Sequence, residues 1–170
     1  MTKKNEPALK LHQPDHRLYT LEVVLFDGPM TDKFVKKNSM VSRTIQIRGD
    51  QTLEDFHLAI FEAFGRDDEH LYEFQFGKKP MDPEARRYGL SDDSGMYEND
   101  EGRQPAGLVN NTTFDSLSLK VGNRFFYWFD FGDDWWHHIQ VNAIDDKIPP
   151  GKFPKVTAKV GKSPPQYADE

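Results

Sequence analysis

The sequence predicts an α+β fold in which a mostly antiparallel β-sheet packs on one main α-helix. Apolar and polar residues alternate along several short segments, which is the pattern of half-buried strands, whereas one segment has the spacing of an amphipathic helix. Along the chain the elements read strand, strand, helix, strand and then a hairpin. This order favours an antiparallel sheet with a helix covering one face.

Two alternating segments open the predicted domain. Leu18–Phe26 places apolar side chains on one side of an extended chain, and Val41–Arg48 repeats the pattern. The residues Asp27-Gly28-Pro29 end the first segment as a turn. We expect the two strands to pair antiparallel across the polar loop Lys33–Ser39.

The helix follows Gly49-Asp50, where the spacing of apolar residues lengthens to three or four. Thr52 can cap the first turn together with Asp55, and Gly65 ends the helix. The apolar face includes one imidazole, that of His57. The residues on this face are Leu53, Phe56, His57, Ile60 and Phe64.

The remaining segments complete the sheet. His70–Phe76 alternates as a strand, and Arg124–Asp130 and Trp135–Val141 form a hairpin around Gly132. Within the polar segment 77–111, Arg86–Leu90 is a candidate edge strand. In the proline-rich tail, residues 156–160 alternate and can lie along a sheet edge.

These elements predict one domain over residues 18–160, preceded by a flexible leader, 1–17, and followed by a tail, 161–170. Residues 77–111 form a polar insertion, interpreted either as a solvated loop or as a functional flap. The sequence has no run of about 18 apolar residues, the length that a membrane span requires. The chain contains no cysteine, which excludes disulfides and thiolate metal sites, and we expect a cytoplasmic protein.

The formal net charge of −6 disfavours nucleic acid as a partner, because binding to phosphate backbones calls for clustered cations. An unknown protein or small molecule is expected instead, and no cofactor is predicted. The plausible basic strip comprises Lys33, Lys36, Lys37, Arg43 and Arg48.

Candidate site residues gather at the hairpin of residues 124–141. Asp130 and Asp133 flank Gly132, a spacing that brings two carboxylates together at a turn. His137 projects from the return strand, and His57 on the helix needs a buried partner, for which a hairpin carboxylate is the candidate. We therefore expect the ring of His57 to meet Asp130 and Asp133.

Three interpretations of this cluster stay open. In the first, the carboxylates accept backbone N–H groups within their own turn and the histidines are ordinary members of a sheet–helix interface. In the second, the Asp and His side chains hold magnesium, manganese or zinc and activate water. In the third, the aromatic residues form a recognition surface for a peptide, sugar or base. Trp135 and Trp136 must face opposite sides of their strand, so one of them should be exposed or covered by the tail.

Three blocks of sequence carry a family resemblance. They are Leu53–Ile60 with its apolar-His pair, His70–Phe74, and the stretch Tyr-Trp-Phe-Asp-Phe-Gly-Asp-Asp-Trp-Trp-His of residues 127–137. The chain resembles the plasmid open-reading-frame-three-like family, named from a root-inducing plasmid and linked to the passenger protein of an insertion element. Arg66 stands where family members often have tryptophan, and the tail lacks their Pro-Pro-Glu-Asp ending.

The resemblance implies a roll similar to a β-grasp arrangement and assigns no reaction. The preferred hypothesis is a noncatalytic interaction or accessory protein, associated with plasmids or mobile elements, that uses His57, Asp130, Asp133, Trp135 and His137 for binding. One alternative is a metal-assisted hydrolase that uses the Asp and His residues. Another is a nucleic-acid-binding accessory protein.

Overall fold

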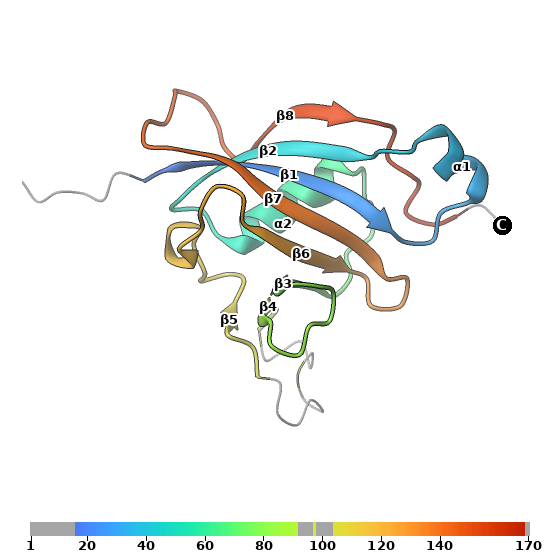
Figure 1. Cartoon of the computed structure of the whole chain (residues 1–170), viewed down its shortest axis with the longest axis horizontal. Coiled ribbons are helices and arrows are strands. Elements are labelled where there is room, and N and C mark those ends of the chain that lie inside the picture. The colour runs from blue at the N-terminus through green and yellow to red at the C-terminus, as the bar shows by residue number, and fades with distance from the viewer. Residues whose placement is uncertain (1–15, 92–96, 98–103, 169–170) are drawn as a thin grey trace, which may run out of the picture.

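The computed structural model describes residues 16–91, 97 and 104–168. Its centre is one sheet with the strand order β5-β4-β3-β6-β7-β1-β2-β8, antiparallel except for the β4–β5 pair. Figure 1 shows this sheet as a twisted layer with helix α2 behind it. The predicted α+β class with a mostly antiparallel sheet is therefore confirmed. The described strands are β1 (Leu18–Asp27), β2 (Ser42–Arg48), β3 (Tyr72–Phe76), β4 (Arg86–Gly89), β5 (Gly107–Leu108), β6 (Arg124–Phe129), β7 (Trp135–Asp145) and β8 (Lys155–Val160).

The long strands β1 and β7 lie side by side at the middle of the sheet. Strand β1 pairs antiparallel with β2, as the alternating segments predict, and with β7 on its other side. The predicted hairpin is formed by β6 and β7, whose register sets Tyr127 opposite His137 and Trp128 opposite Trp136. Strand β8, the alternating stretch of the tail, extends the sheet beyond β2.

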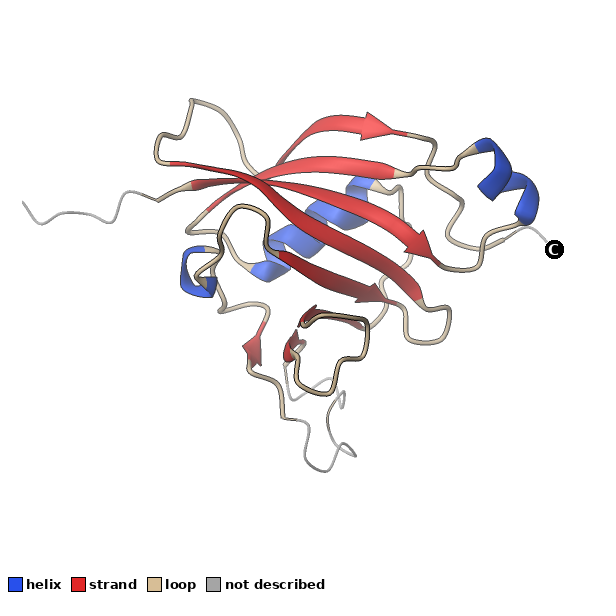
Figure 2. Ribbon diagram, viewed as in Figure 1, coloured by secondary structure: helices blue, strands red, loops and turns tan. Residues whose placement is uncertain are grey.

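Helix α2 (Leu53–Ala63) covers one face of the sheet, as Figure 2 shows. Its start is fixed by a capping box: Thr52 accepts from the backbone N–H of Asp55, and the Asp55 carboxylate accepts from the backbone N–H of Thr52. After its last turn Gly65 takes a φ of +63°, the left-handed conformation that glycine adopts without strain. The predicted helix and both of its ends are confirmed.

Large aromatic side chains fill the space between α2 and the sheet. Phe56 of the helix stacks on Phe74 of β3 with ring centroids 5.9 Å apart, and it meets Phe114 edge-on at 5.2 Å. Aromatic side chains thus fill much of the core alongside Leu, Ile and Val, and each removes a large area from water. The fully buried members with the greatest volume include Trp135, Tyr19, Tyr127, Phe56, Phe64 and Phe74.

No described helix crosses the opposite face of the sheet, which we call the open face. Because successive side chains of a strand alternate between faces, Trp135 lies in the core and Trp136 on the open face. Trp136 is nevertheless only 8% exposed. The ring of Trp128 covers it, lying 5.1 Å away and parallel within 3°.

The structure adds detail to segments that the sequence describes as loops or as a tail. Residues Asp32–Lys37, inside the loop between β1 and β2, form the short helix α1, capped by Thr31. The predicted polar insertion contributes β4 and β5 to the sheet, whereas residues 92–96 and 98–103 lie outside the described part, as do residues 1–15 of the predicted leader. In the tail, buried Gln166 accepts from the backbone N–H groups of Asp67 and Asp68.

The predicted basic strip is not one continuous surface. Arg43 is buried and donates to the carbonyl of Ala63 at the end of α2, and its guanidinium group lies over the ring of Phe64. Arg48 is paired with Asp50 at 3.0 Å. The predicted basic strip therefore does not include Arg43, because its alternating position on β2 places it on the helix-covered face.

Candidate functional site

The imidazole of His57 lies between a tyrosine and a glutamate. Its Nδ1 is 2.6 Å from the hydroxyl of Tyr127, and its Nε2 is 3.0 Å from a carboxylate oxygen of Glu69. A carboxylate can only accept, so Nε2 carries the proton and Nδ1 accepts from the tyrosine hydroxyl. The ring also stacks on Tyr72 with centroids 3.6 Å apart. Every polar atom of this buried imidazole is therefore satisfied.

Burial keeps this imidazole neutral. His57 is 2% exposed, and desolvation lowers its pKa from 6.5 to about 3. Burial also raises the pKa of Tyr72 and of Tyr127, and it raises that of the half-exposed Glu69 carboxyl. The tyrosine, histidine and glutamate thus form a hydrogen-bonded chain without a cationic member, and Tyr127, 1% exposed, closes its inner end.

His137 has a different set of partners, centred on the buried Arg66. Its Nδ1 donates to the carbonyl of Tyr127 at 3.3 Å, and its Nε2 faces an Arg66 guanidinium nitrogen at 3.4 Å. The guanidinium lies 4.0 Å from the ring centroid of Trp135. Desolvation, with a smaller contribution from the Arg66 charge, holds the pKa of His137 well below its usual value. Burial lowers the pKa of Arg66 itself to about 10.

Asp130 shapes the turn between β6 and β7. It adopts a φ of +59°, and its Oδ1 accepts from the backbone N–H groups of Gly132 and Asp133. Its other carboxylate oxygen lies 3.4 Å from Nε2 of His70. The carbonyl of Asp130 also accepts from the backbone N–H of Asp134 at 2.7 Å. This is the arrangement of an Asx turn, in which a carboxylate satisfies backbone groups of its own bend.

The predicted meeting of His57 with Asp130 and Asp133 is therefore not found. Glu69 and Tyr127 occupy the two ring nitrogens of His57, and Asp130 is engaged by its turn and by His70. Among the described residues, no group of three or more His, Asp or Glu side chains has the arrangement of a metal site. The predicted residues instead divide between a sheet–helix interface, which holds His57, Trp135 and His137, and a surface turn.

Sequence reasoning overlooked Glu69, Arg66, Tyr127 and Tyr72 as the partners of the two buried histidines. The sequence could have indicated Tyr127 and Tyr72 as partners, because the alternation of their strands places both on the helix-covered face. Glu69 and Arg66 lie in the irregular segment after α2, where no periodicity indicates direction. Only the path of that segment across the end of the helix brings them to the histidines.

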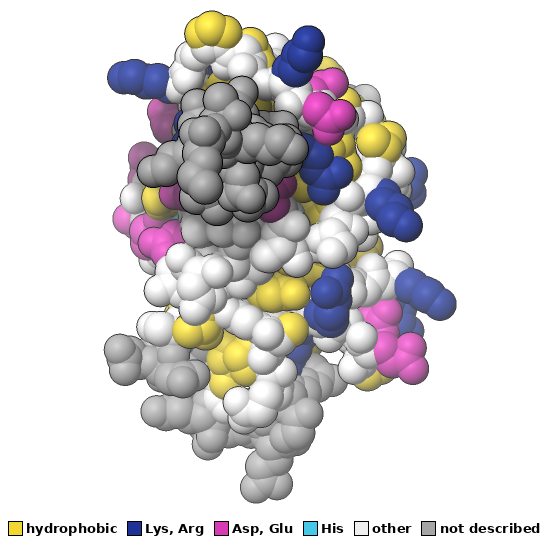
Figure 3. All heavy atoms as spheres, turned by 90° about the vertical axis from the view of Figure 1, so that its left-hand side faces the viewer, with side chains coloured by type: hydrophobic (Ala, Val, Ile, Leu, Met, Phe, Trp, Pro, Cys, Tyr) yellow, Lys and Arg dark blue, Asp and Glu magenta, His cyan; other side chains and the backbone are white. Residues whose placement is uncertain are grey.

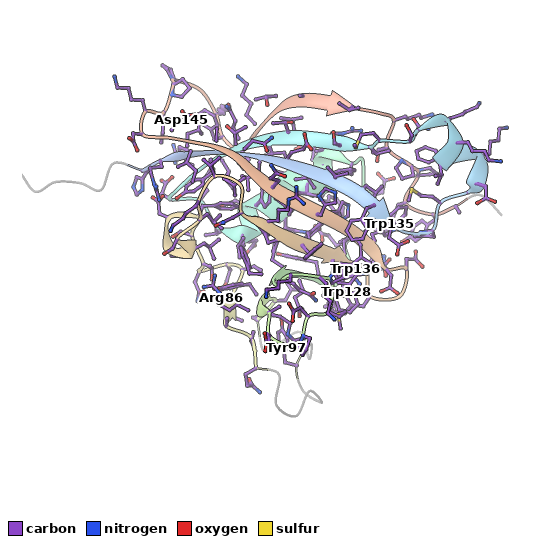
Figure 4. The ribbon with its side chains drawn as sticks, in the orientation of Figure 1. Arg86, Tyr97, Trp128, Trp135, Trp136 and Asp145 are labelled. Atoms are coloured by element: carbon purple, nitrogen blue, oxygen red, sulfur yellow. The ribbon has the colours of Figure 1, made fainter. Side chains whose placement is uncertain are left out.

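The open face carries a second group of aromatic residues, which Figure 4 places around the end of the β6–β7 hairpin. Trp128 stacks on Trp136 and also on Phe131. The ring centroids of Trp128 and Phe131 are 3.9 Å apart. Its indole N–H donates to the carboxylate of Asp134 at 2.9 Å. This part of the open face is consequently packed and hydrogen-bonded.

A groove of about 560 Å³ lies beside this packed group. Phe26 of β1, Phe126 of β6 and His138 of β7 form its aromatic side, with Phe26 43% exposed. The ring of Phe26 meets Phe126 at 6.2 Å, edge-on, and His138 at 5.7 Å. Lys78 and Arg124 also line the groove. No sequence pattern indicates this groove, because its walls come from three strands and two loops.

Comparison with known proteins supplies a family and a fold. The family model for the plasmid pRiA4b ORF-3-like protein matches residues 33–168. One similar solved structure is a protein of unknown function, MM3350, from Methanosarcina mazei Go1. It is 20% identical with a TM-score of 0.63, and the match covers 88% of this chain and 72% of that one.

At this level of identity the likeness concerns the fold alone. No curated protein matches the chain. The family match extends from α1 to the tail and includes helix α2, both buried histidines and the β6–β7 turn. The chain therefore belongs to the plasmid pRiA4b ORF-3-like protein family.

Proposed function

We propose that the protein is a noncatalytic binding protein and that the open face of its sheet contacts the partner. One observation carries this proposal: the groove beside β6 exposes aromatic rings on the face that no described helix covers. Exposed aromatic side chains next to a concavity are typical of ligand and partner sites. Phe26, at 43% exposure, is the most accessible of these rings.

The burial of the other candidate residues supports the noncatalytic part of the proposal. His57, Tyr127 and His137 are 2%, 1% and 1% exposed, and none of them lines the groove. A general base must come within hydrogen-bond distance of the proton that it removes. A substrate cannot reach these three groups without moving the helix or the sheet.

The test is titration of the folded protein with anilinonaphthalene sulfonate, a fluorescent aromatic anion. We expect saturable binding of one dye per chain, weakened roughly tenfold or more in Phe126→Ala, a change of about 1.4 kcal/mol. Leu58→Ala is the control, because Leu58 is an equally apolar, half-exposed side chain on the far side of the sheet.

Near-ultraviolet circular dichroism must show that both variants stay folded. Equal weakening by the two substitutions, or binding that Phe126→Ala leaves unchanged, contradicts the assignment of the open face.

A further inference from the structure

The lining of the groove differs in charge from the chain as a whole. The chain has a formal charge of −6, yet the residues that line the groove include two cations, Lys78 and Arg124, and no carboxylate. Within the described residues, neither cation has an ion pair within 4.0 Å. Arg124 is held in place by a neutral partner, because its Nε donates to the amide oxygen of Gln140 at 3.1 Å.

Two acidic groups, Asp82 and Glu22, act on groups of the groove without lining it themselves. The Asp82 carboxylate accepts from the backbone N–H groups of Lys78 and Glu84, so it is engaged by its own turn. Glu22 acts on His138 more weakly than Arg124 does, and desolvation is the largest cause of the lowered pKa of that imidazole. A neutral His138 adds a ring and a hydrogen-bonding group to the lining.

Both cations line the same groove as the exposed rings. Arg124 precedes Phe126 by two residues on β6, so both side chains point to the open face about 7 Å apart along the strand. Phe26 and His138 extend the aromatic side of the groove across β1 and β7. A planar ring placed against these side chains has a guanidinium and an ammonium within reach of a substituent.

We propose that this groove binds a small molecule in which a planar ring is joined to a phosphate or carboxylate, the chemistry of a mononucleotide. The inference rests on the proposed binding function of the open face and specifies its ligand. The rings supply stacking surface, and Lys78 and Arg124 neutralise the anion.

The size of the groove and the distribution of charge favour a single small molecule over a nucleic-acid strand. A volume of about 560 Å³ falls in the range typical of small-molecule sites. Binding of a strand requires a continuous row of cations along its backbone. The groove lining itself includes two cations, Lys78 and Arg124, and at the end of the molecule that Figure 3 faces, acidic side chains lie among the Lys and Arg side chains.

Calorimetric titration of the full chain separates the contribution of the ligand's ring to the affinity from that of its charge. The probes are adenosine monophosphate, which has both, adenosine, which has only the ring, and inorganic phosphate, which has only the charge. We expect the monophosphate to bind at least roughly tenfold more tightly than either of the others, a difference of about 1.4 kcal/mol or more. A monophosphate that binds no better than phosphate alone overturns the proposal.

Two variants and one matched control locate the site. Phe126→Leu removes a ring and keeps an apolar side chain, and Lys78→Gln removes a charge. Lys79→Gln removes the same charge one residue along the loop, from a side chain that does not line the groove. We expect the first two to weaken binding of the monophosphate several-fold and Lys79→Gln to leave it unchanged. Equal effects of Lys78→Gln and Lys79→Gln contradict the site.

A single-stranded oligonucleotide completes the test. If it binds no more tightly per chain than the mononucleotide, the small-molecule assignment stands, whereas much tighter and strongly salt-dependent binding overturns it. If anilinonaphthalene sulfonate binds at Phe126 but the mononucleotide does not, the ligand class is wrong and the binding function of the face remains.

Discussion

The hydroxyl of Tyr127 donates a hydrogen bond to Nδ1 of His57 over 2.6 Å, joining β6 to helix α2. The same imidazole donates through Nε2 to Glu69. A buried histidine with both nitrogens satisfied fixes the position of the helix on the sheet and has no nitrogen left for a substrate or metal. The polar groups on the helix-covered face therefore have a structural role, whereas the accessible rings lie on the open face.

Removal of the tyrosine hydroxyl should destabilise the protein. In Tyr127→Phe the Nδ1 of His57 loses its donor inside the core, and an unpaired buried acceptor costs roughly 1–3 kcal/mol. Urea denaturation followed by circular dichroism measures the free energy of unfolding. Tyr167→Phe removes a hydroxyl that bonds Asp68 at the surface and should cost far less. Equal losses in the two variants would argue against the role of the buried bond.

The buried histidines should make the protein sensitive to acid. The pKa of His57 is about 3 in the folded chain and about 6.5 in the unfolded one, so between these values only the unfolded state binds the proton. Stability is therefore fully present above about pH 6.5 and decreases as the pH falls towards 3, by at most about 1.4 kcal/mol per pH unit for each such histidine. The lowered pKa of His137 acts in the same direction.

Denaturant midpoints measured from about pH 7 down to about pH 4 test this dependence. His57→Gln, which does not titrate, should show a shallower decline than the unaltered protein. Val121→Ala, at an exposed position without a titratable side chain, is the control and should reproduce the original slope. A slope that His57→Gln leaves unaltered would show that His57 does not contribute.

Asp130 should stabilise the protein through the hydrogen bonds of its turn. Asp130→Asn keeps an oxygen that accepts from Gly132 and Asp133 and tolerates a positive φ, so we expect a loss of less than about 1 kcal/mol. Asp130→Ala loses both acceptor bonds and keeps the left-handed backbone, so we expect about 1–3 kcal/mol. Thermal melts of the two variants provide the measurement. A melting temperature lowered as much by Asn as by Ala would show that the carboxylate charge, and not the turn, is important.

Added metal should leave the melting temperature unchanged. The two nitrogens of His57 are occupied, and Asp130 bonds its own turn, so the four residues of the metal hypothesis do not converge. We expect magnesium, manganese and zinc, each added to chelator-treated protein, to give no stabilisation beyond that of a salt control. A concentration-dependent rise with one of these ions would refute this prediction, because a ligand that binds only the folded state stabilises it.

Local patterns predicted helix α2 with its capping box, the pairing of β1 with β2 and the β6–β7 hairpin. Each depends on residues close in the chain: Thr52 with Asp55, alternation along a strand, and a bend around Gly132. The same alternation placed Trp135 and Trp136 on opposite faces. It did not predict that the Trp128 ring would cover Trp136, because that depends on the register between two strands.

The sequence by itself determined the class of the fold, its main helix and the concentration of aromatic residues in the last hairpin, because periodicity and capping act over a few residues. Only the tertiary structure decided the partners of the polar groups. Whether His57 meets Asp130 or Glu69 depends on how an irregular segment crosses the end of α2, and the groove exists only where β1, β6, β7 and two loops converge. Side-chain contacts between segments distant in the chain are set by the packing of the whole core, for which no short sequence pattern is a sufficient guide.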